Sequence, residues 1–138
     1  MWVRDSLVYG PRRIRVTVNE LADLGDCDVI VISVGSIISD DHSRLTELKG
    51  SVAIVDAVIP VIMAAGFKGI FVSITNPCDI VAYRIWKLSG LPSSHVIGTG
   101  TALDTARLLD QLSALSGISA QSIEAFCLGE HGDSQIIP

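Results

Sequence analysis

Two runs of aliphatic residues, separated by a long helical stretch, constrain most strongly what this chain can fold into. The first run, Asp28 to Val34, ends at Gly35, and the second spans Lys68 to Ile74. Between them, Ser43 to Ala65 has the composition of a helix, although it contains Pro60. A strand, a helix and a second strand in this order predict parallel strands in an α/β fold. Because the first run is rich in β-branched residues, we expect its strand to be buried on both faces.

Helix-start signals predict two further helices. Asn76 is placed to cap the first, with Pro77 at its first helical position. Thr101 and Asp104 have the spacing of a capping box for the second. The remaining expected elements are strands at Arg13–Val18, His95–Gly98 and Ser122–Leu128, a helical turn at Asn19–Leu24, and helices ending near Leu88 and covering Thr101–Leu115.

Composition excludes several classes of function. The formal net charge is -5 and the basic residues are scattered, which disfavours nucleic acid and anionic membranes as partners. The three cysteines are far apart, without CxxC or histidine at metal spacing, so we expect neither a disulfide framework nor a metal site. The longest apolar stretch, Val52 to Phe67, contains Asp56 and is shorter than the roughly 20 residues of a membrane span. A reducing cytoplasm is the expected location.

Several polar residues follow predicted strands, where open α/β sheets bind ligands. A histidine, an aspartate able to orient it, and arginines suit proton transfer on a small anionic substrate. Taken singly, each residue has a structural explanation: Asn76 and Asp104 as helix caps, Arg107 as a solvated charge, and His131 as a loop residue. Their combination is what points to a reaction.

Three segments of the sequence resemble signature motifs of the lactate and malate dehydrogenase superfamily. They are NPCD (Asn76–Asp79), GTGTALDTAR (Gly98–Arg107) and GEHGDS (Gly129–Ser134), in the family's order. The intervals of 28 residues from Asn76 to Asp104, 3 to Arg107 and 24 to His131 are also similar to the family's spacing. Within the superfamily, the chain most resembles the L-lactate and L-2-hydroxyisocaproate dehydrogenases.

The resemblance implies an NAD-dependent reaction that interconverts 2-keto and L-2-hydroxy acids. It assigns His131 as the proton donor and acceptor, and Asp104 as the carboxylate that orients and stabilises its imidazolium. Arg107 is expected to bind the substrate carboxylate through its planar guanidinium. Arg44 is expected to polarise the substrate carbonyl.

Further contacts are implied for substrate and cofactor. By the resemblance, Ile38 stands where lactate dehydrogenases commonly carry Gln and malate dehydrogenases carry Arg. An apolar residue there disfavours malate and favours a bulkier aliphatic substrate side chain. Asn76 is expected to contact both substrate and cofactor. The other expected NAD contacts are Gly35, Ser36, Ile74, Thr75 and Thr99.

The resemblance also implies a domain organisation. No GxGxxG turn occurs in the 138 residues, so we expect residues 1–97 to form a partial Rossmann-like, doubly wound NAD-binding domain without its first βαβ unit. Residues 98–138 are expected to begin a truncated α+β substrate domain. The full-length enzyme is expected to be a homo-oligomer, a dimer or a tetramer. Two alternatives stay open: a truncated product without catalysis, and, less favoured, a malate dehydrogenase.

Overall fold

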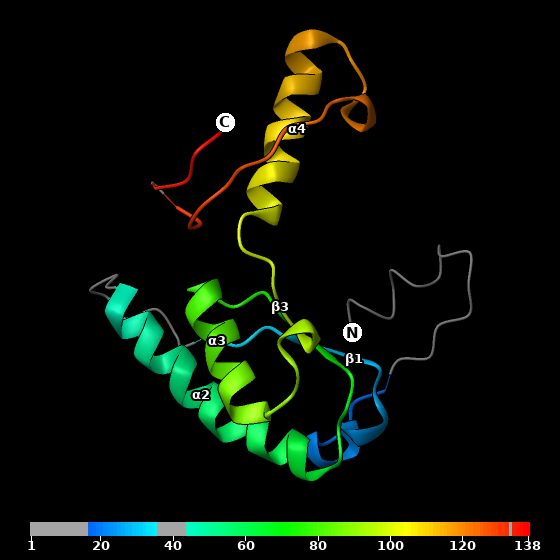
Figure 1. Ribbon diagram of the computed structural model, residues 1–138, viewed down its shortest axis with the longest axis vertical. Coiled ribbons are helices and arrows are strands. Elements are labelled where there is room, and N and C mark those ends of the chain that lie inside the picture. Colours follow the sequence, from blue (N-terminus) through cyan, green and yellow to red (C-terminus); the bar gives the residue numbers. More distant parts are fainter. Residues whose placement is uncertain (1–16, 36–43, 133) are drawn as a thin grey trace.

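A parallel sheet of three strands organises the amino-terminal part of the molecule. The computed structural model describes residues 17–35, 44–132 and 134–138, and only the backbone of residues 44–47. Strands β1 (Val29–Ile32), β2 (Ile70–Ser73) and β3 (Val96–Gly98) lie side by side in sequence order, all parallel (Figure 1). The predicted α/β class, the parallel sheet and the three strand positions are therefore confirmed.

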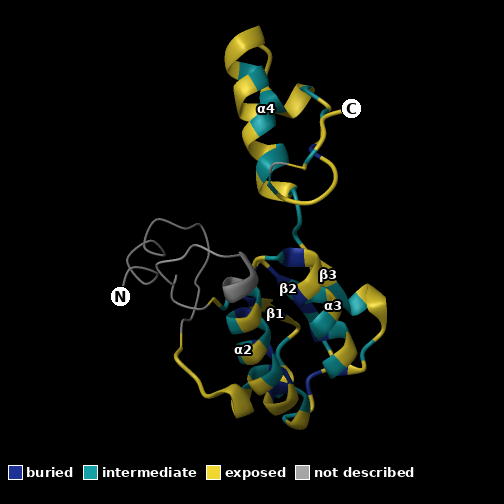
Figure 2. Ribbon diagram, turned by 90° about the vertical axis from the view of Figure 1, so that its left-hand side faces the viewer, coloured by how far each residue is buried: buried dark blue, intermediate teal, exposed yellow. Residues whose placement is uncertain are grey.

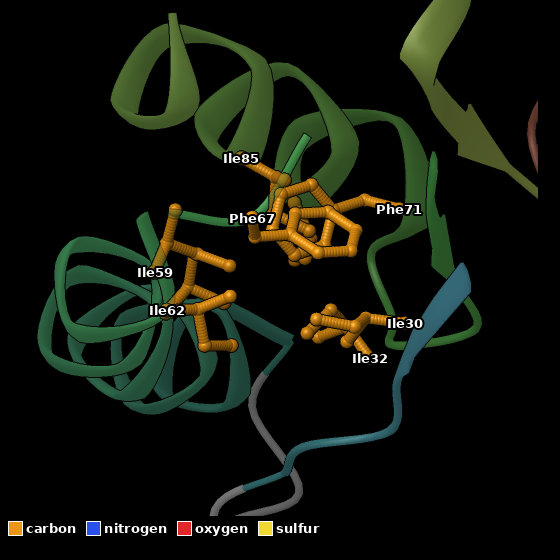
Figure 3. Packing of buried hydrophobic residues seen from close by; sticks show 9 residues of the cluster. Ile30, Ile32, Ile59, Ile62, Phe67, Phe71 and Ile85 are labelled. Atoms are coloured by element: carbon orange, nitrogen blue, oxygen red, sulfur yellow. The ribbon is translucent and has the colours of Figure 1, made fainter. Parts of the chain in front are cut away.

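Two helices connect these strands and pack against one face of the sheet. Helix α2 (Arg44–Ala64) joins β1 to β2 and continues through Pro60, and α3 (Cys78–Ser89) joins β2 to β3. Phe67 and Phe71 lie at the centre of the shared core, with ring centroids 4.6 Å apart (Figure 3). The buried cluster consists of Ile30, Ile32, Val55, Ile59, Ile62, Phe67, Phe71, Val81 and Ile85.

No described element covers the other face of the sheet, and β1 is exposed there, which contradicts the prediction that it is buried on both faces. Ile30 and Ile32 are buried, but Val29 and Val31 between them are 52% and 57% exposed. Ile97 on β3 is also exposed. The reason is that α2 and α3 pack on the same side, so only alternate residues of the apolar run face a described helix.

Short 3-10 helices complete this part of the fold. The first, η2 (Leu21–Asp26), confirms the predicted helical turn, and η3 (Ser93–His95) leads directly into β3. The strand predicted at Arg13–Val18 lies mostly outside the described residues, and residues 17 and 18 belong to no strand. No described helix is long and apolar enough to cross a membrane.

Helix α4 (Ala102–Ser116) extends away from the sheet (Figures 1 and 2). The 3-10 helix η4 (Ala120–Ser122) follows it, and the chain then returns along α4. The strand predicted at Ser122–Leu128 is wrong, since the described residues give this segment one isolated bridge, from Leu128 to Ile136. A strand needs a backbone neighbour, whereas here side-chain hydroxyls of α4 bind the backbone of Cys127.

Neither predicted side-chain cap forms. Helix α3 begins at Cys78, so Pro77 rather than Asn76 is the N-cap residue, and it has no side-chain hydrogen bond. Thr101 is the N-cap of α4 but makes no capping hydrogen bond. Its hydroxyl instead donates to the carbonyl oxygen of Cys127, at 2.6 Å. Both side chains of the expected capping box therefore contact the returning chain, because Asp104 also turns toward it, to His131.

An ion pair between α2 and α3 predicts a pH-dependent contribution to stability. Arg84 donates two hydrogen bonds to Asp56, Nε to Oδ1 at 2.6 Å and Nη2 to Oδ2 at 2.9 Å. These hydrogen bonds lower the pKa of Asp56 below its ordinary value of 3.8; desolvation opposes them, and the guanidinium charge reinforces them. The folded state is therefore stabilised above the ordinary pKa, and this contribution is lost as the pH falls through the lowered pKa.

We expect Asp56→Asn to lower the melting temperature most above about pH 5 and progressively less in acid. Thermal unfolding of the wild type, Asp56→Asn, Arg84→Gln and the double variant, measured from pH 7 to pH 2.5, would isolate the coupling between the two side chains. Both side chains are partly exposed, so we expect a modest effect. A coupling that stays constant or grows in acid would contradict this origin.

Candidate functional site

His131 lies in a tight loop that two glycines and a backbone pairing shape. Leu128 and Ile136 exchange N–H to carbonyl hydrogen bonds of 2.8 and 2.9 Å, which close the loop between them. Gly129 and Gly132 have φ angles of 93° and 130°, a region that side chains disfavour. The backbone conformation therefore explains the two glycines of the GEHG sequence, which turn the chain on either side of the histidine.

The loop brings His131 into contact with Asp104, which lies in the first turn of α4. His131 Nδ1 is 2.5 Å from Asp104 Oδ2. An ionised carboxylate only accepts hydrogen bonds, so Nδ1 is the donor, and Nε2 remains for another partner. The Asp104 side chain is 10% exposed and that of His131 is 39% exposed. The aspartate is thus shielded behind a histidine that solvent or a ligand can reach.

Arg107 lies one helical turn after Asp104, on the same side of α4. Its Nη1 is 3.9 Å from Asp104 Oδ1, and its side chain is 67% exposed. An ion pair this long and exposed holds the guanidinium weakly. Arg107 is therefore available to an incoming carboxylate beside the His131–Asp104 pair.

A pocket of about 380 Å³ joins His131 to the start of α3. Residues 76–80 form one part of its lining, Gly100 another, and residues 130–132 a third. Two residues predicted from separate motifs, Asn76 and His131, thus line the same cavity. The volume lies within the range of about 300–1,000 Å³ that small-molecule sites occupy.

The residues predicted to contact a cofactor differ in how accessible they are. Ile74 is half exposed at the end of β2. Thr75 is buried, and its hydroxyl accepts a hydrogen bond from Val34 N and can donate to Val34 O, both at 2.9 Å. The Thr99 hydroxyl donates to Ser73 O at 3.3 Å. The two threonine side chains therefore connect the ends of neighbouring strands.

Of the other predicted site residues, three lie outside the described part of the structure in whole or in their side chain, and Gly35 does not line this pocket. Arg44 is the first residue of α2, but its side chain is outside the described part of the structure, as are Ser36 and Ile38 altogether. Gly35 is exposed at the end of the segment after β1, and a Cβ built on it would meet no atom within 4 Å. The described surroundings thus do not require glycine there.

Comparison with known proteins identifies the family of this chain. Residues 3–98 match the family model described as the lactate/malate dehydrogenase, NAD binding domain. This chain belongs to the lactate/malate dehydrogenase family. The match confirms the resemblance stated on the motifs, and it confirms NAD as the cofactor of this kind of domain.

Curated relatives and a solved structure extend the likeness beyond residue 98. The chain is 47% identical over 132 residues to L-lactate dehydrogenase 2 of Listeria monocytogenes, covering 95% of this chain and 42% of that enzyme. It is 49% identical over 132 residues to an L-lactate dehydrogenase of Fusobacterium nucleatum, covering 96% and 41%. A minor L-lactate dehydrogenase of Enterococcus mundtii superposes with a TM-score of 0.90 at 34% identity, covering 96% and 42%. The chain thus spans less than half the length of these relatives.

Within this lactate/malate dehydrogenase chain, the pocket includes residues to which the sequence analysis gave no role. Cys78 is buried, and its sulfur accepts a hydrogen bond from Gly100 N at 3.2 Å. Asp79 and Glu130 add two carboxylates to the lining. These three residues lie within the NPCD and GEHGDS motifs. Their nearness in sequence to Asn76 and His131 was therefore the signal that could have identified them. Among the described residues, no cluster of histidine, cysteine and acidic side chains could hold a metal ion.

Proposed function

We propose that this chain supplies the acid–base machinery of an NAD-dependent L-2-hydroxyacid dehydrogenase, which interconverts 2-keto and L-2-hydroxy acids. The hydrogen bond of 2.5 Å between His131 and Asp104, at a pocket shared with Asn76, carries this proposal. A shielded carboxylate against one ring nitrogen of a reachable histidine is the arrangement that a proton-transferring pair requires.

His131 acts as the proton donor when a keto acid is reduced. Its Nδ1–H is held by Asp104, so the proton delivered to the substrate oxygen comes from Nε2. Asp104 stabilises the imidazolium before the transfer and keeps the ring oriented afterwards. In the reverse direction Nε2 accepts the hydroxyl proton of the L-2-hydroxy acid. Bound NAD supplies the chemistry of hydride transfer at the substrate carbon.

Two arginines and an amide complete the proposed substrate site. Arg107 binds the substrate carboxylate with its two-pronged guanidinium, for which its exposure leaves it free. Asn76, which lines the pocket together with His131, donates a hydrogen bond to the substrate. Arg44 is proposed to stabilise charge on the substrate oxygen, as the family resemblance implies.

The described residues fit the nicotinamide end of NAD. Ile74 and Asn76 are exposed where β2 ends, and this edge of the sheet adjoins the pocket that contains His131. Ligands of open parallel sheets bind at this edge. Gly35, Ser36 and Thr99 remain proposed contacts, whereas Thr75 would contribute its backbone, since its hydroxyl is occupied. The sequence contains no GxGxxG turn for the pyrophosphate.

The substrate is proposed to be a monocarboxylic 2-keto acid. The relatives named above are L-lactate dehydrogenases, which favours pyruvate and lactate. Because Ile38 is apolar, we further propose a substrate with a branched aliphatic side chain, such as 2-ketoisocaproate. An apolar residue there cannot pair with the second carboxylate of malate. A homo-oligomer, a cytoplasmic location and the division into residues 1–97 and 98–138 are further proposals. Three free cysteines suit a reducing compartment.

The proposal is tested in a chimera, in which this chain replaces the segment that it matches in the Listeria monocytogenes enzyme. Every residue assigned a role above then comes from this chain. We expect NADH-dependent reduction of pyruvate and 2-ketoisocaproate, measured by loss of absorbance at the nicotinamide band. A soluble, folded chimera without activity toward any 2-keto acid would favour the alternative of a non-catalytic product.

Ile38→Arg in the chimera should shift specificity toward oxaloacetate. A buried second carboxylate without a partner costs at least a few kcal/mol, so pairing it should change the ratio of kcat/KM values by about a hundredfold or more. The ratio for oxaloacetate against 2-ketoisocaproate is measured with and without the substitution. If both activities fall equally, Ile38 does not contact the substrate side chain.

A further inference from the structure

Two threonines, one at the N-cap of α4 and one in its first turns, bind a single residue of the returning chain. Thr101 Oγ1 donates to the carbonyl oxygen of Cys127 at 2.6 Å, and Cys127 N donates to Thr105 Oγ1 at 3.0 Å. Cys127 is 4% exposed, so water cannot readily replace either hydroxyl. Because residues four apart lie on one face of a helix, the two hydroxyls can bind the N–H and the carbonyl of the same residue. We call Thr101, Thr105 and the backbone of Cys127 the threonine clamp.

The threonine clamp lies next to both residues of the His131–Asp104 pair along the chain. Asp104 lies between the two threonines in sequence and is adjacent to Thr105. On the returning chain, Leu128 follows Cys127 and forms the backbone pairing that closes the His131 loop. The loop is thus fixed to α4 at its base by the threonines and at its tip by the bond from His131 to Asp104.

We infer that Thr101 and Thr105 are positioning residues that set the distance from His131 to Asp104. The inference rests on the proposed function, because that distance matters only if the pair transfers protons. The Thr101 hydroxyl does not serve as a helix cap, since the side chain makes no capping hydrogen bond. Nor does a sheet supply the backbone partners of residue 127, since the described strands do not include it.

A positioning role predicts an effect on turnover rather than on substrate binding. Thr105→Val has nearly the same shape but leaves the buried Cys127 N–H without an acceptor. The loop should then move relative to α4, and displacements of about 1 Å at a reacting group can cost up to about a hundredfold in rate. In the chimera we expect kcat for pyruvate to fall by about ten- to a hundredfold, with KM changed less than about threefold.

The 138-residue chain itself provides a second readout. The Nδ1 proton of His131 should give a slowly exchanging NMR signal, which is assigned by its loss in His131→Gln. Thr105→Val should abolish or broaden this signal, and Thr105→Ser, which restores the hydroxyl, should recover both the signal and kcat. Thr101→Val should have a weaker effect of the same kind, because an unpaired carbonyl is tolerated better than an unpaired N–H.

Ser116→Ala is the matched control. Its hydroxyl donates to Leu112 O at 2.6 Å and accepts from Ile118 N at 3.2 Å, near the other end of α4, so the substitution removes a hydroxyl that bonds neither Cys127 nor His131. We expect wild-type kcat and an unchanged His131 signal.

The outcomes separate the inference from the proposed function. If Thr105→Val keeps wild-type kcat and the His131 signal while His131→Gln is inactive, the clamp does not position the histidine. If the serine variant is as impaired as the valine variant, the hydroxyl is not what matters. If His131→Gln is as active as the wild type, the proposed function itself fails.

Discussion

Asp104→Asn in the chimera is expected to slow the reduction of pyruvate by at least about a hundredfold while the fold is retained. Asp104 Oδ2 accepts a hydrogen bond from His131 Nδ1 at 2.5 Å. An asparagine of the same shape cannot stabilise the imidazolium by charge. Its amide can also donate to Nδ1, which would place the remaining ring proton on Nε2 of a neutral histidine, a weaker acid than the imidazolium.

The loss should appear in the step that includes proton transfer. Single-turnover measurements with saturating pyruvate and NADH isolate this step, and circular dichroism checks the fold. Asp110→Asn is the control, since Asp110 is an exposed aspartate on the same helix. Unchanged single-turnover rates for Asp104→Asn would remove this carboxylate from the mechanism and leave only a structural role.

Replacing Arg107 should weaken recognition of the substrate carboxylate. We expect Arg107→Leu to lower kcat/KM for pyruvate by at least about a hundredfold, mainly through a higher KM, because a charge-assisted, two-pronged hydrogen bond is lost. Arg107→Lys should recover part of this loss, since it keeps the charge but not the planar geometry. NADH affinity should be unchanged.

A ketone without a carboxylate distinguishes a loss of carboxylate binding from a general disruption of the site in Arg107→Leu. Acetone should be a poor substrate for the wild type, and Arg107→Leu should reduce its turnover little, because no carboxylate is bound. Arg84→Gln is the control for removing an arginine, as Arg84 pairs with Asp56 between α2 and α3. An equal loss of activity toward pyruvate and acetone in Arg107→Leu would assign Arg107 to the integrity of α4 instead.

The order of apolar runs and helical stretches was sufficient to predict the sheet region of the fold. The runs Asp28–Val34 and Lys68–Ile74 contain β1 and β2, and the long stretch between them is α2. Their burial was harder to predict, because a continuous aliphatic run does not reveal whether helices cover one face or two. Val29 and Val31 are exposed since both described helices pack on the opposite side.

The errors near the site share a physical cause. Thr101 and Asp104 have the spacing of a local capping box, yet their side chains bond to residues 127 and 131, more than 25 positions away. Local sequence favours the cap, but tertiary contacts with the returning chain prevail. The same contacts replace the strand predicted at Ser122–Leu128. The pairing of His131 with Asp104 could be predicted only from the motif resemblance, whereas the threonine clamp required the structure.

Transfer of deuterium from the cofactor to the product tests whether His131 supports the reduction of a 2-keto acid. The chimera is given pyruvate and NADH carrying deuterium at both C4 positions of the nicotinamide, and the product is analysed by mass spectrometry and chiral chromatography. We expect L-lactate with one deuterium at C2 from the wild type, and at least about a hundredfold less of it in the same time from His131→Gln. Lactate without deuterium, the D isomer, or equal product from both proteins would contradict the claim that His131 of this chain supports hydride transfer to a 2-keto acid.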